Sequence, residues 1–208
     1  MASNSQTLQR SLPNATIAAG TSQQPAVPAV ASNNNWIEGF VTEQIDPNDK
    51  DFKWLISKVK KSGDLFTVHK AYRIKNSATW ASYVETRKKI YEEMGSSERV
   101  LEKRLFHGSP FSLKIAEEGF KLSYARNGSC GVGVYFSNLS SESYSFSMKN
   151  GAQTSYHMLI CRVALGKMSS GTTALTPGYH SVNYGSKFVV YDEKQAYPSF
   201  LIEIKPKS

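Results

Sequence analysis

A histidine, a glycine and a serine follow one another at positions 107–109, directly after the apolar pair Leu105 and Phe106. This run predicts a short buried strand that ends at a turn. Gly108 would let a flat ligand approach the backbone and use its N–H and C=O, a donor and acceptor pair that matches a carboxamide. His107 beside it could hydrogen-bond a ribose hydroxyl. The alternative is a histidine that only fills the core.

A second run with suitable chemistry is Gly-Val-Gly-Val-Tyr-Phe-Ser at 131–137. It predicts another strand, on which Tyr135 could stack against a flat ring. Gly131 and Gly133 would keep that strand open near a ligand. The two runs together predict the walls of a nucleotide pocket. The sequence has no Cys/His cluster for a metal, no glycine-rich phosphate loop and no Ser-His-Asp order, so we expect a metal-free site that works by positioning and electrostatics.

Composition separates a tail from a domain in this chain of 208 residues. Residues 1–35 carry one charged side chain, Arg10, and no aromatic residue that could anchor a core. We therefore predict a disordered low-complexity tail over 1–35. The remaining residues, 36–208, suffice for one domain with a sizeable core.

The formal net charge of +8 would suit an acidic partner, such as nucleic acid or an anionic nucleotide. The basic residues at 58–61 and 87–89 form no long block, however, and are typical of solvated helix faces. No stretch approaches the roughly 20 apolar residues of a membrane span. Cys130 and Cys161 form no disulfide framework, which favours reduced thiols in an intracellular protein, cytoplasmic or nuclear.

Hydrophobic periodicity predicts an α+β fold, with two helices first and then a mostly antiparallel β core that carries short helices in its connections. Helices are predicted over 47–61 (capped by Asp46), 77–94 (capped by Asn76), after Pro110, and around 140–148. Strands are predicted over 65–74, 105–109, 131–137, 155–165, 187–192 and 200–205, with an entering strand or arm over 36–46. Loops are predicted over 120–130 and 166–186. A loop as long as 120–130 inside a compact domain is often functional.

Four motifs, in order and at sensible spacing, resemble the catalytic domain of the poly(ADP-ribose) polymerase family, a diphtheria-toxin-like ADP-ribosyltransferase. They are Leu-Phe-His-Gly-Ser at 105–109, the glycine–tyrosine run at 131–137, Lys-Phe-Val-Val-Tyr-Asp at 187–192 with Gln-Ala-Tyr-Pro at 195–198, and Arg-Ile-Lys-Asn-Ser-Ala-Thr-Trp at 73–80. The resemblance implies a PARP-like catalytic domain over 36–208, with a split, mostly antiparallel β core and peripheral helices. It also implies NAD as a substrate and a protein acceptor.

The resemblance assigns roles to individual positions. His107 would hold a ribose 2′-hydroxyl of NAD, and Gly108 would clamp the nicotinamide amide through its backbone. Ser109 would touch the adenosine end. Tyr135 would lie under the nicotinamide ring.

A Ser-rich predicted helix follows the second motif, and its positions match further family contacts. Counted from Tyr135, Ser143 matches a second amide contact, and Tyr144 or Phe146 matches a second stacking aromatic, with Phe146 favoured by its offset. Ordinary helix packing is the alternative for these three residues. The loop at 120–130 would be the flap over the dinucleotide.

Lys187 is where the chain departs from the family pattern. Polymerising members carry a glutamate there, which orients the ribose and activates the acceptor hydroxyl for elongation. A charged lysine can neither accept a hydrogen bond nor act as a base. The resemblance therefore implies mono-ADP-ribosylation, and the alternative is an inactive module that binds NAD, ADP-ribose or a protein. An inward-pointing Lys187 would oppose an oxocarbenium-like transition state, whereas it could also point to solvent or pair with a phosphate.

Overall fold

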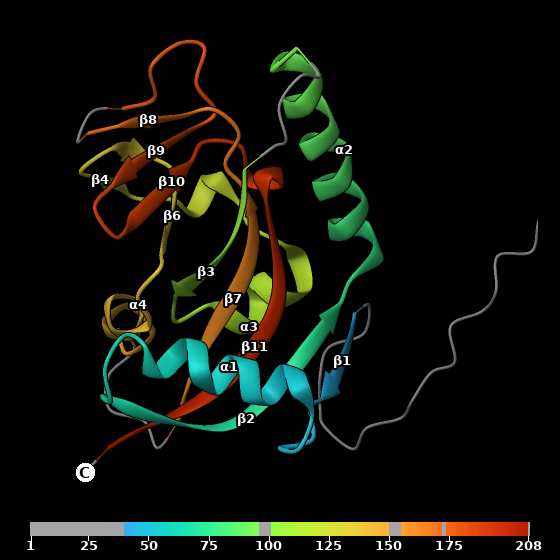
Figure 1. Cartoon of the computed structure of the whole chain (residues 1–208), viewed down its shortest axis with the longest axis vertical. Coiled ribbons are helices and arrows are strands. Elements are labelled where there is room, and N and C mark those ends of the chain that lie inside the picture. The colour runs from blue at the N-terminus through green and yellow to red at the C-terminus, as the bar shows by residue number, and fades with distance from the viewer. Residues whose placement is uncertain (1–39, 96–100, 150–154, 172–173, 208) are drawn as a thin grey trace, which may run out of the picture. The chain divides into compact units, whose positions relative to one another are not determined.

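The computed structural model of the chain describes residues 40–95, 101–149, 155–171 and 174–207 (Figure 1). The tail predicted over 1–35 lies outside these residues. The helices are α1 (Lys50–Lys60), α2 (Ser77–Glu93), α3 (Ser112–Glu118) and α4 (Ser140–Ser147), with short 3₁₀ turns η1 (Leu122–Tyr124) and η2 (Glu193–Gln195). No helix in the described residues is long and apolar enough to cross a membrane.

A nine-stranded sheet, with the strand order β1-β2-β11-β7-β3-β6-β10-β9-β8, forms the centre of the fold. Its strands are β1 (Val41–Gln44), β2 (Phe66–Lys75), β3 (Glu102–Gly108), β6 (Val134–Ser137), β7 (Tyr156–Ala164), β8 (Met168–Ser170), β9 (Ser181–Tyr184), β10 (Lys187–Val190) and β11 (Ala196–Pro206). Neighbouring strands run antiparallel except β8 and β9. A small hairpin joins β4 (Asn127–Gly128) to β5 (Gly131–Val132). The predicted α+β class with a mostly antiparallel core is therefore confirmed.

The sheet narrows to one residue pair at its middle. β3 lies along β7 over its whole length, but it meets β6 only where Phe106 lies opposite Ser137. Beyond Phe106, no strand of the described residues pairs with the edge of β3 that faces β6. The sheet is therefore split at this junction, as predicted, while one apolar cluster continues across it from Leu201 of β11 to Phe188 of β10.

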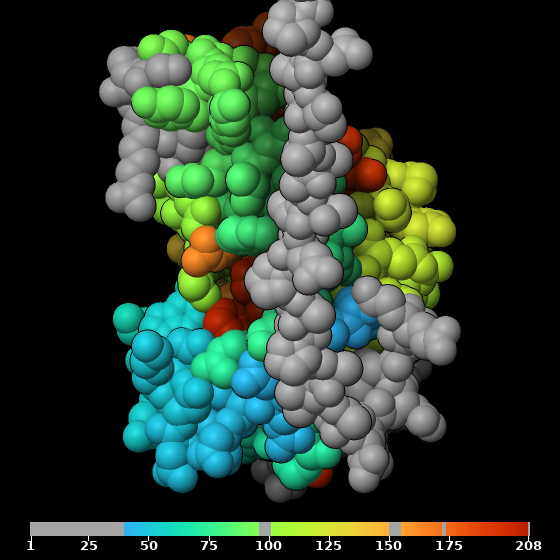
Figure 2. Space-filling model, turned by 90° about the vertical axis from the view of Figure 1, so that its right-hand side faces the viewer, coloured from blue at the N-terminus to red at the C-terminus, as the bar shows by residue number. Residues whose placement is uncertain are grey.

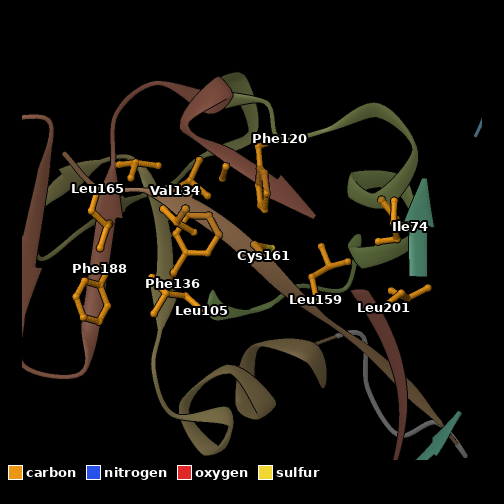
Figure 3. Close-up of a cluster of buried hydrophobic side chains, with 14 of the residues drawn as sticks. Ile74, Leu105, Phe120, Val134, Phe136, Leu159, Cys161, Leu165, Phe188 and Leu201 are labelled. Atoms are coloured by element: carbon orange, nitrogen blue, oxygen red, sulfur yellow. The ribbon is translucent and has the colours of Figure 1, made fainter. Parts of the chain in front are cut away.

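Both faces of the sheet are covered by apolar packing. The alternating side chains of β7 place Leu159 and Cys161 on one face, with Phe120, Phe136 and residues of α3 (Figure 3). Ile160 points to the other face and packs with Leu55 of α1. In Figure 1, α1 crosses in front of β7 and β11, α2 stands to their right, and α3 lies behind. The near-continuous apolar run of β7 follows from this two-sided burial.

Of the two predicted helix caps, one is confirmed and the other differs for a local reason. Asn76 caps α2 as predicted, because its side chain accepts from the Thr79 amide at 3.1 Å. The cap of α1 is Asp49 and not Asp46. Asp46 accepts from the Asn48 amide in a turn that precedes the helix, so the helix begins three residues later than the predicted start.

The predicted loop over 166–186 was wrong in part, because it contains β8 and β9. β8 is short and its residues are partly or fully exposed, so it lacks the alternation that marks a half-buried strand. Its pairing comes from β9, which itself pairs with β10. β11 likewise begins at Ala196, because pairing with β7 extends the strand through the segment around Pro198.

Candidate active site

The predicted site residues gather where β3 and β6 separate. His107 and Gly108 end β3, Tyr135 lies on β6, and Ser143 lies on α4. These residues are far apart in the sequence, but Phe106 of β3 pairs with Ser137 of β6. This pairing holds the ends of the two strands side by side. The fold thus brings together the first two predicted motifs.

The ring of His107 is fixed in one tautomer. Its Nδ1 lies 2.8 Å from the carbonyl oxygen of Tyr135. Because a carbonyl only accepts, Nδ1 carries the proton, and Nε2 of the neutral ring is left as an acceptor. The Phe120 ring meets the imidazole edge-on, with 5.0 Å between centroids. His107 is therefore oriented to accept a hydrogen bond from a hydroxyl, as the ribose role requires.

Burial keeps this imidazole uncharged. It lowers the pKa of His107 from 6.5 to about 4, although the hydrogen bond to Tyr135 raises it. Between about pH 6.5 and 4, the unfolded chain binds a proton at this position that the folded chain does not. We expect the free energy of unfolding to fall as the pH falls through this window, by up to ~1.4 kcal/mol per pH unit, and to be independent of His107 above it.

Urea unfolding of the wild-type chain and of His107→Gln across this pH range would measure the effect, since the difference between the two isolates one titration. His157 also has a pKa lowered by burial, and its contribution cancels in that difference. An NMR titration of the His107 ring with a midpoint near the unperturbed value of 6.5 would contradict the prediction.

Gly108 lies against the backbone of α4. A β-carbon at this position would be 1.7 Å from the carbonyl oxygen of Ser143 and 2.6 Å from its carbonyl carbon. Only glycine allows this approach of strand to helix. Ser143 is 5% exposed, and its carbonyl oxygen also accepts from the Ser147 hydroxyl at 3.3 Å. Gly108 and Ser143 are thus neighbours through the backbone of Ser143, as two residues predicted to contact one amide must be.

The side chain of Tyr135 anchors the C-terminal end of the predicted flap, the loop over 120–130. Its hydroxyl donates to the Gly131 carbonyl at 2.7 Å and accepts from the Cys130 amide at 2.9 Å. Burial raises the pKa of Tyr135, so the phenol stays protonated. A β-carbon on Gly128 would lie 2.6 Å from the phenol ring. The loop from 120 to 130 is therefore held at both ends of the site, through Phe120 on His107 and through this tyrosine.

The two candidates for the second stacking aromatic have different surroundings. Tyr144 stacks on Phe66 with ring centroids 4.9 Å apart, and it packs with the core between α1 and the sheet. Phe146 is 47% exposed, and the Lys149 ammonium lies 4.3 Å from its ring centroid. Phe146 offers the more accessible ring face, from which a bound ligand would displace a flexible lysine. Its assignment stays a prediction.

Ser109 lies at the start of the turn into α3. Its hydroxyl accepts from the Phe111 amide at 3.1 Å, and its carbonyl accepts from the Ser112 hydroxyl at 2.7 Å. The side chain is partly exposed and still has its own proton to donate. This geometry allows the predicted contact to the adenosine end and does not test it.

Lys187 begins β10 and faces the same side of the sheet as Tyr135. The register places Lys187 opposite Ser137 and Val189 opposite Tyr135, and alternation puts all four side chains on one face. The ammonium leans toward β9, 5.8 Å from the Tyr184 ring centroid. Within the described part of the chain, no carboxylate oxygen lies within 4.0 Å of it. The lysine therefore shares the Tyr135 face of the sheet, with its charge directed away from β6.

Glu142 was missed by the sequence reasoning. Its carboxylate accepts from the Ser137 hydroxyl at 2.7 Å and from the Ser186 hydroxyl at 2.5 Å. It thereby ties α4 to β6 and to the residue that precedes Lys187. The signal was present, because Glu142 is the single charged residue in the predicted Ser-rich helix and directly precedes Ser143. Its partners, however, come from segments far away in the chain.

The assembled groups can hold an amide, a hydroxyl and a flat ring. The backbone of Gly108 and the hydroxyl of Ser143 suit an amide, and Nε2 of His107 suits a ribose hydroxyl. The aromatic rings of Tyr135 and Phe146 suit a flat ring. No group of three or more His, Cys, Asp or Glu side chains gathers into a metal site in the described ranges. The absence of a metal stays a prediction.

The chain is similar to known proteins. Residues 49–187 match the family model described as the poly(ADP-ribose) polymerase catalytic domain. A probable poly(ADP-ribose) polymerase of Dictyostelium discoideum is 28% identical over 153 residues, which cover 68% of this chain and 45% of the relative. The human protein mono-ADP-ribosyltransferase PARP14 is 28% identical over 191 residues, covering 81% of this chain and 10% of the relative. Human protein mono-ADP-ribosyltransferase PARP12 is 24% identical over 82% of this chain and 26% of its own length. The chain thus spans less than half the length of each of these relatives.

Proposed function

Since this chain belongs to the poly(ADP-ribose) polymerase catalytic-domain family, we propose that it transfers one ADP-ribosyl group from NAD to a protein acceptor and releases nicotinamide. The bond between nicotinamide and ribose breaks, and nicotinamide leaves with the electron pair. The acceptor nucleophile then bonds to the anomeric carbon and loses its proton to solvent. We also propose a cytoplasmic or nuclear location, for which the two free cysteines are the only support.

One juxtaposition carries this proposal: the neutral His107 ring, the Tyr135 strand and the Gly108–Ser143 contact meet at one junction. In the proposed complex, Gly108 and Ser143 orient the nicotinamide amide, and His107 accepts from a ribose hydroxyl. Fixing the ribose and the leaving group in this way favours bond breaking because the reacting groups are already aligned. The residues need no metal for this chemistry.

Transfer of a single group follows from Lys187. Elongation needs a base that activates a hydroxyl of the ADP-ribose already attached, and a charged lysine cannot serve. Glu142 supplies a carboxylate nearby, but both of its oxygens are already bound by serine hydroxyls. We therefore propose mono-ADP-ribosylation, in line with the two human relatives, which are protein mono-ADP-ribosyltransferases.

Incubation of the purified chain with labelled NAD and a mixture of candidate acceptor proteins tests the proposal. We expect stoichiometric release of nicotinamide and discrete labelled bands without a ladder of longer products. A ladder would contradict single transfer. Binding of NAD by thermal shift, without nicotinamide release or label transfer, would instead favour an inactive binding module.

We expect Lys187→Glu to raise the rate of NAD cleavage about tenfold. The change replaces a cation on the Tyr135 face of the sheet by an anion, a difference of two unit charges. At roughly 10 Å and an effective dielectric constant of about 40, between the values for protein and water, this difference contributes ~1.7 kcal/mol to the stability of a positively charged transition state. Measuring nicotinamide release at saturating NAD would report this rate.

Lys194→Glu makes the same change of charge at an exposed position in η2 and serves as the matched control. The control should leave nicotinamide release within about twofold of wild type. Equal rates for both variants would show that the reaction does not feel the charge at position 187. The tenfold expectation would then be wrong.

A further inference from the structure

Two arginines face each other on adjacent central strands, on the other side of the sheet from His107. Arg104 of β3 lies directly opposite Arg162 of β7 in the register. Their side chains share the face that α1 and α2 cover, whereas His107, three residues after Arg104, points to the opposite face. Like charges directly opposite each other destabilise a sheet. The fold therefore tolerates electrostatic repulsion between Arg104 and Arg162.

Aromatic rings from both helices surround the two guanidinium groups. Arg104 lies 5.1 Å from the ring centroid of Trp54 in α1 and 5.4 Å from that of Phe200. Arg162 lies 5.5 Å from Trp80 in α2. Lys58 adds a third cation, 5.9 Å from the Trp54 ring. We call Trp54, Lys58, Trp80, Arg104 and Arg162 the arginine–tryptophan patch.

The nearby carboxylates do not neutralise the patch. Glu102 lies 3.7 Å from Arg162, but it also lies 3.5 Å from Arg87 and accepts a hydrogen bond from the Tyr83 hydroxyl. Asp49 and Asp51 on the α1 side are both bound by the guanidinium of Arg73, at 2.8 and 3.0 Å.

Two cations of the patch are left without a carboxylate. Among the described residues, neither Arg104 nor Lys58 has a carboxylate oxygen within 4.0 Å. Burial and the neighbouring Arg162 lower the pKa of Arg104, although the charges of Asp51 and Glu102 raise it. The net shift disfavours the charged guanidinium, which an added anion would stabilise.

The patch is open to a ligand. Trp54 and Trp80 are 37% and 38% exposed, and the Arg162 side chain is 34% exposed. Figure 2 shows orange atoms of β7 and red atoms of β11 in a recess between α2, in green, and α1, in cyan. The recess thus presents cations between two partly exposed indoles.

We propose that the arginine–tryptophan patch binds single-stranded nucleic acid. The cations would contact phosphates, and the exposed indole surfaces would stack with bases, the pairing of chemistries that single-strand binders use. An acidic peptide would use the cations but has no flat groups for two tryptophans. The net charge of +8 favours approach of a polyanion.

Titration of the full chain against a fluorescent oligouridylate of about 12 nucleotides tests the proposal. We expect binding at about 50 mM salt that weakens steeply toward about 200 mM. The double variant Arg104→Gln, Arg162→Gln should bind at least about tenfold more weakly than wild type. The variant Lys88→Gln, Lys89→Gln loses the same charge from the outer face of α2, where both side chains are 75% exposed, and should stay within about threefold.

Three results would overturn the proposal. They are absence of binding by the wild type at low salt, equal weakening in both double variants, and displacement of the oligonucleotide by a polyglutamate or phosphopeptide at lower concentration than by unlabelled oligonucleotide. Photocross-linking of a thiouridine-containing oligonucleotide to the wild-type chain gives a test that does not depend on a variant folding. Cross-links should fall in the peptides that contain Trp54 or Trp80. Cross-links confined to other peptides would contradict the proposed binding site.

Discussion

Replacement of His107 by alanine is expected to lower nicotinamide release and label transfer from NAD by about 100-fold or more. The variant removes the acceptor Nε2 that we assign to a ribose hydroxyl. It also leaves the Tyr135 carbonyl without its 2.8 Å hydrogen bond and the Phe120 ring without its edge contact. The ribose would lose its orientation, and the flap would lose its support. Label transfer under single-turnover conditions would measure the loss.

His69→Ala provides the matched control, because His69 is an exposed histidine on β2, outside the site. That variant should retain the activity of wild type within about twofold. A second variant, His107→Gln, keeps an amide oxygen that can accept, so it should recover part of the lost activity. Equal activity of His107→Ala and His69→Ala would show that His107 only fills the core.

Gly108→Ala should abolish detectable NAD binding and lower the free energy of unfolding by about 1–3 kcal/mol. The new methyl would lie 1.7 Å from the Ser143 carbonyl oxygen, so the end of β3 and α4 must move apart. That movement separates the Gly108 backbone from the Ser143 hydroxyl, the two groups that we propose hold one amide. NAD-dependent thermal shift would report binding, and urea unfolding would report stability.

Ser109→Ala tests whether the effect belongs to the glycine. It adds no atom to the crowded contact, and it removes only the hydroxyl that accepts from the Phe111 amide. We expect a stability loss of about 1 kcal/mol or less and NAD binding within about tenfold of wild type. A Gly108→Ala chain that melts and binds NAD like wild type would contradict the packing that the structure shows.

The structure shows where the charge of Lys187 lies. The lysine faces the same side of the sheet as Tyr135, but its ammonium lies near Tyr184 of β9. A cation directed away from β6 disturbs the transition state less than one directed at it, because the interaction falls with distance. This placement is compatible with turnover, while the loss of the glutamate still disfavours chain elongation.

Much of the fold was predictable because its signals are local. The apolar period over 77–94 and the capping chemistry of Asn76 predicted α2, and the apolar run over 155–165 predicted β7 as a central strand. β8 and β9 were missed because their polar residues pair only when β10 is already in place. Their strand conformation depends on a neighbour and not on their own composition.

In the site, too, some features were predictable from the sequence and others depend on the tertiary structure. The sequence by itself determined the chemical groups, namely a histidine followed by a glycine at one strand end, a tyrosine on a second strand and a lysine at the head of a third. Only the tertiary structure decided the tautomer of His107, the closeness of Gly108 to Ser143, the role of Glu142 and the pairing of Arg104 with Arg162. The physical reason is that residue types follow from the chain, whereas distances and proton positions follow from strand register and helix packing, which join segments far apart in sequence.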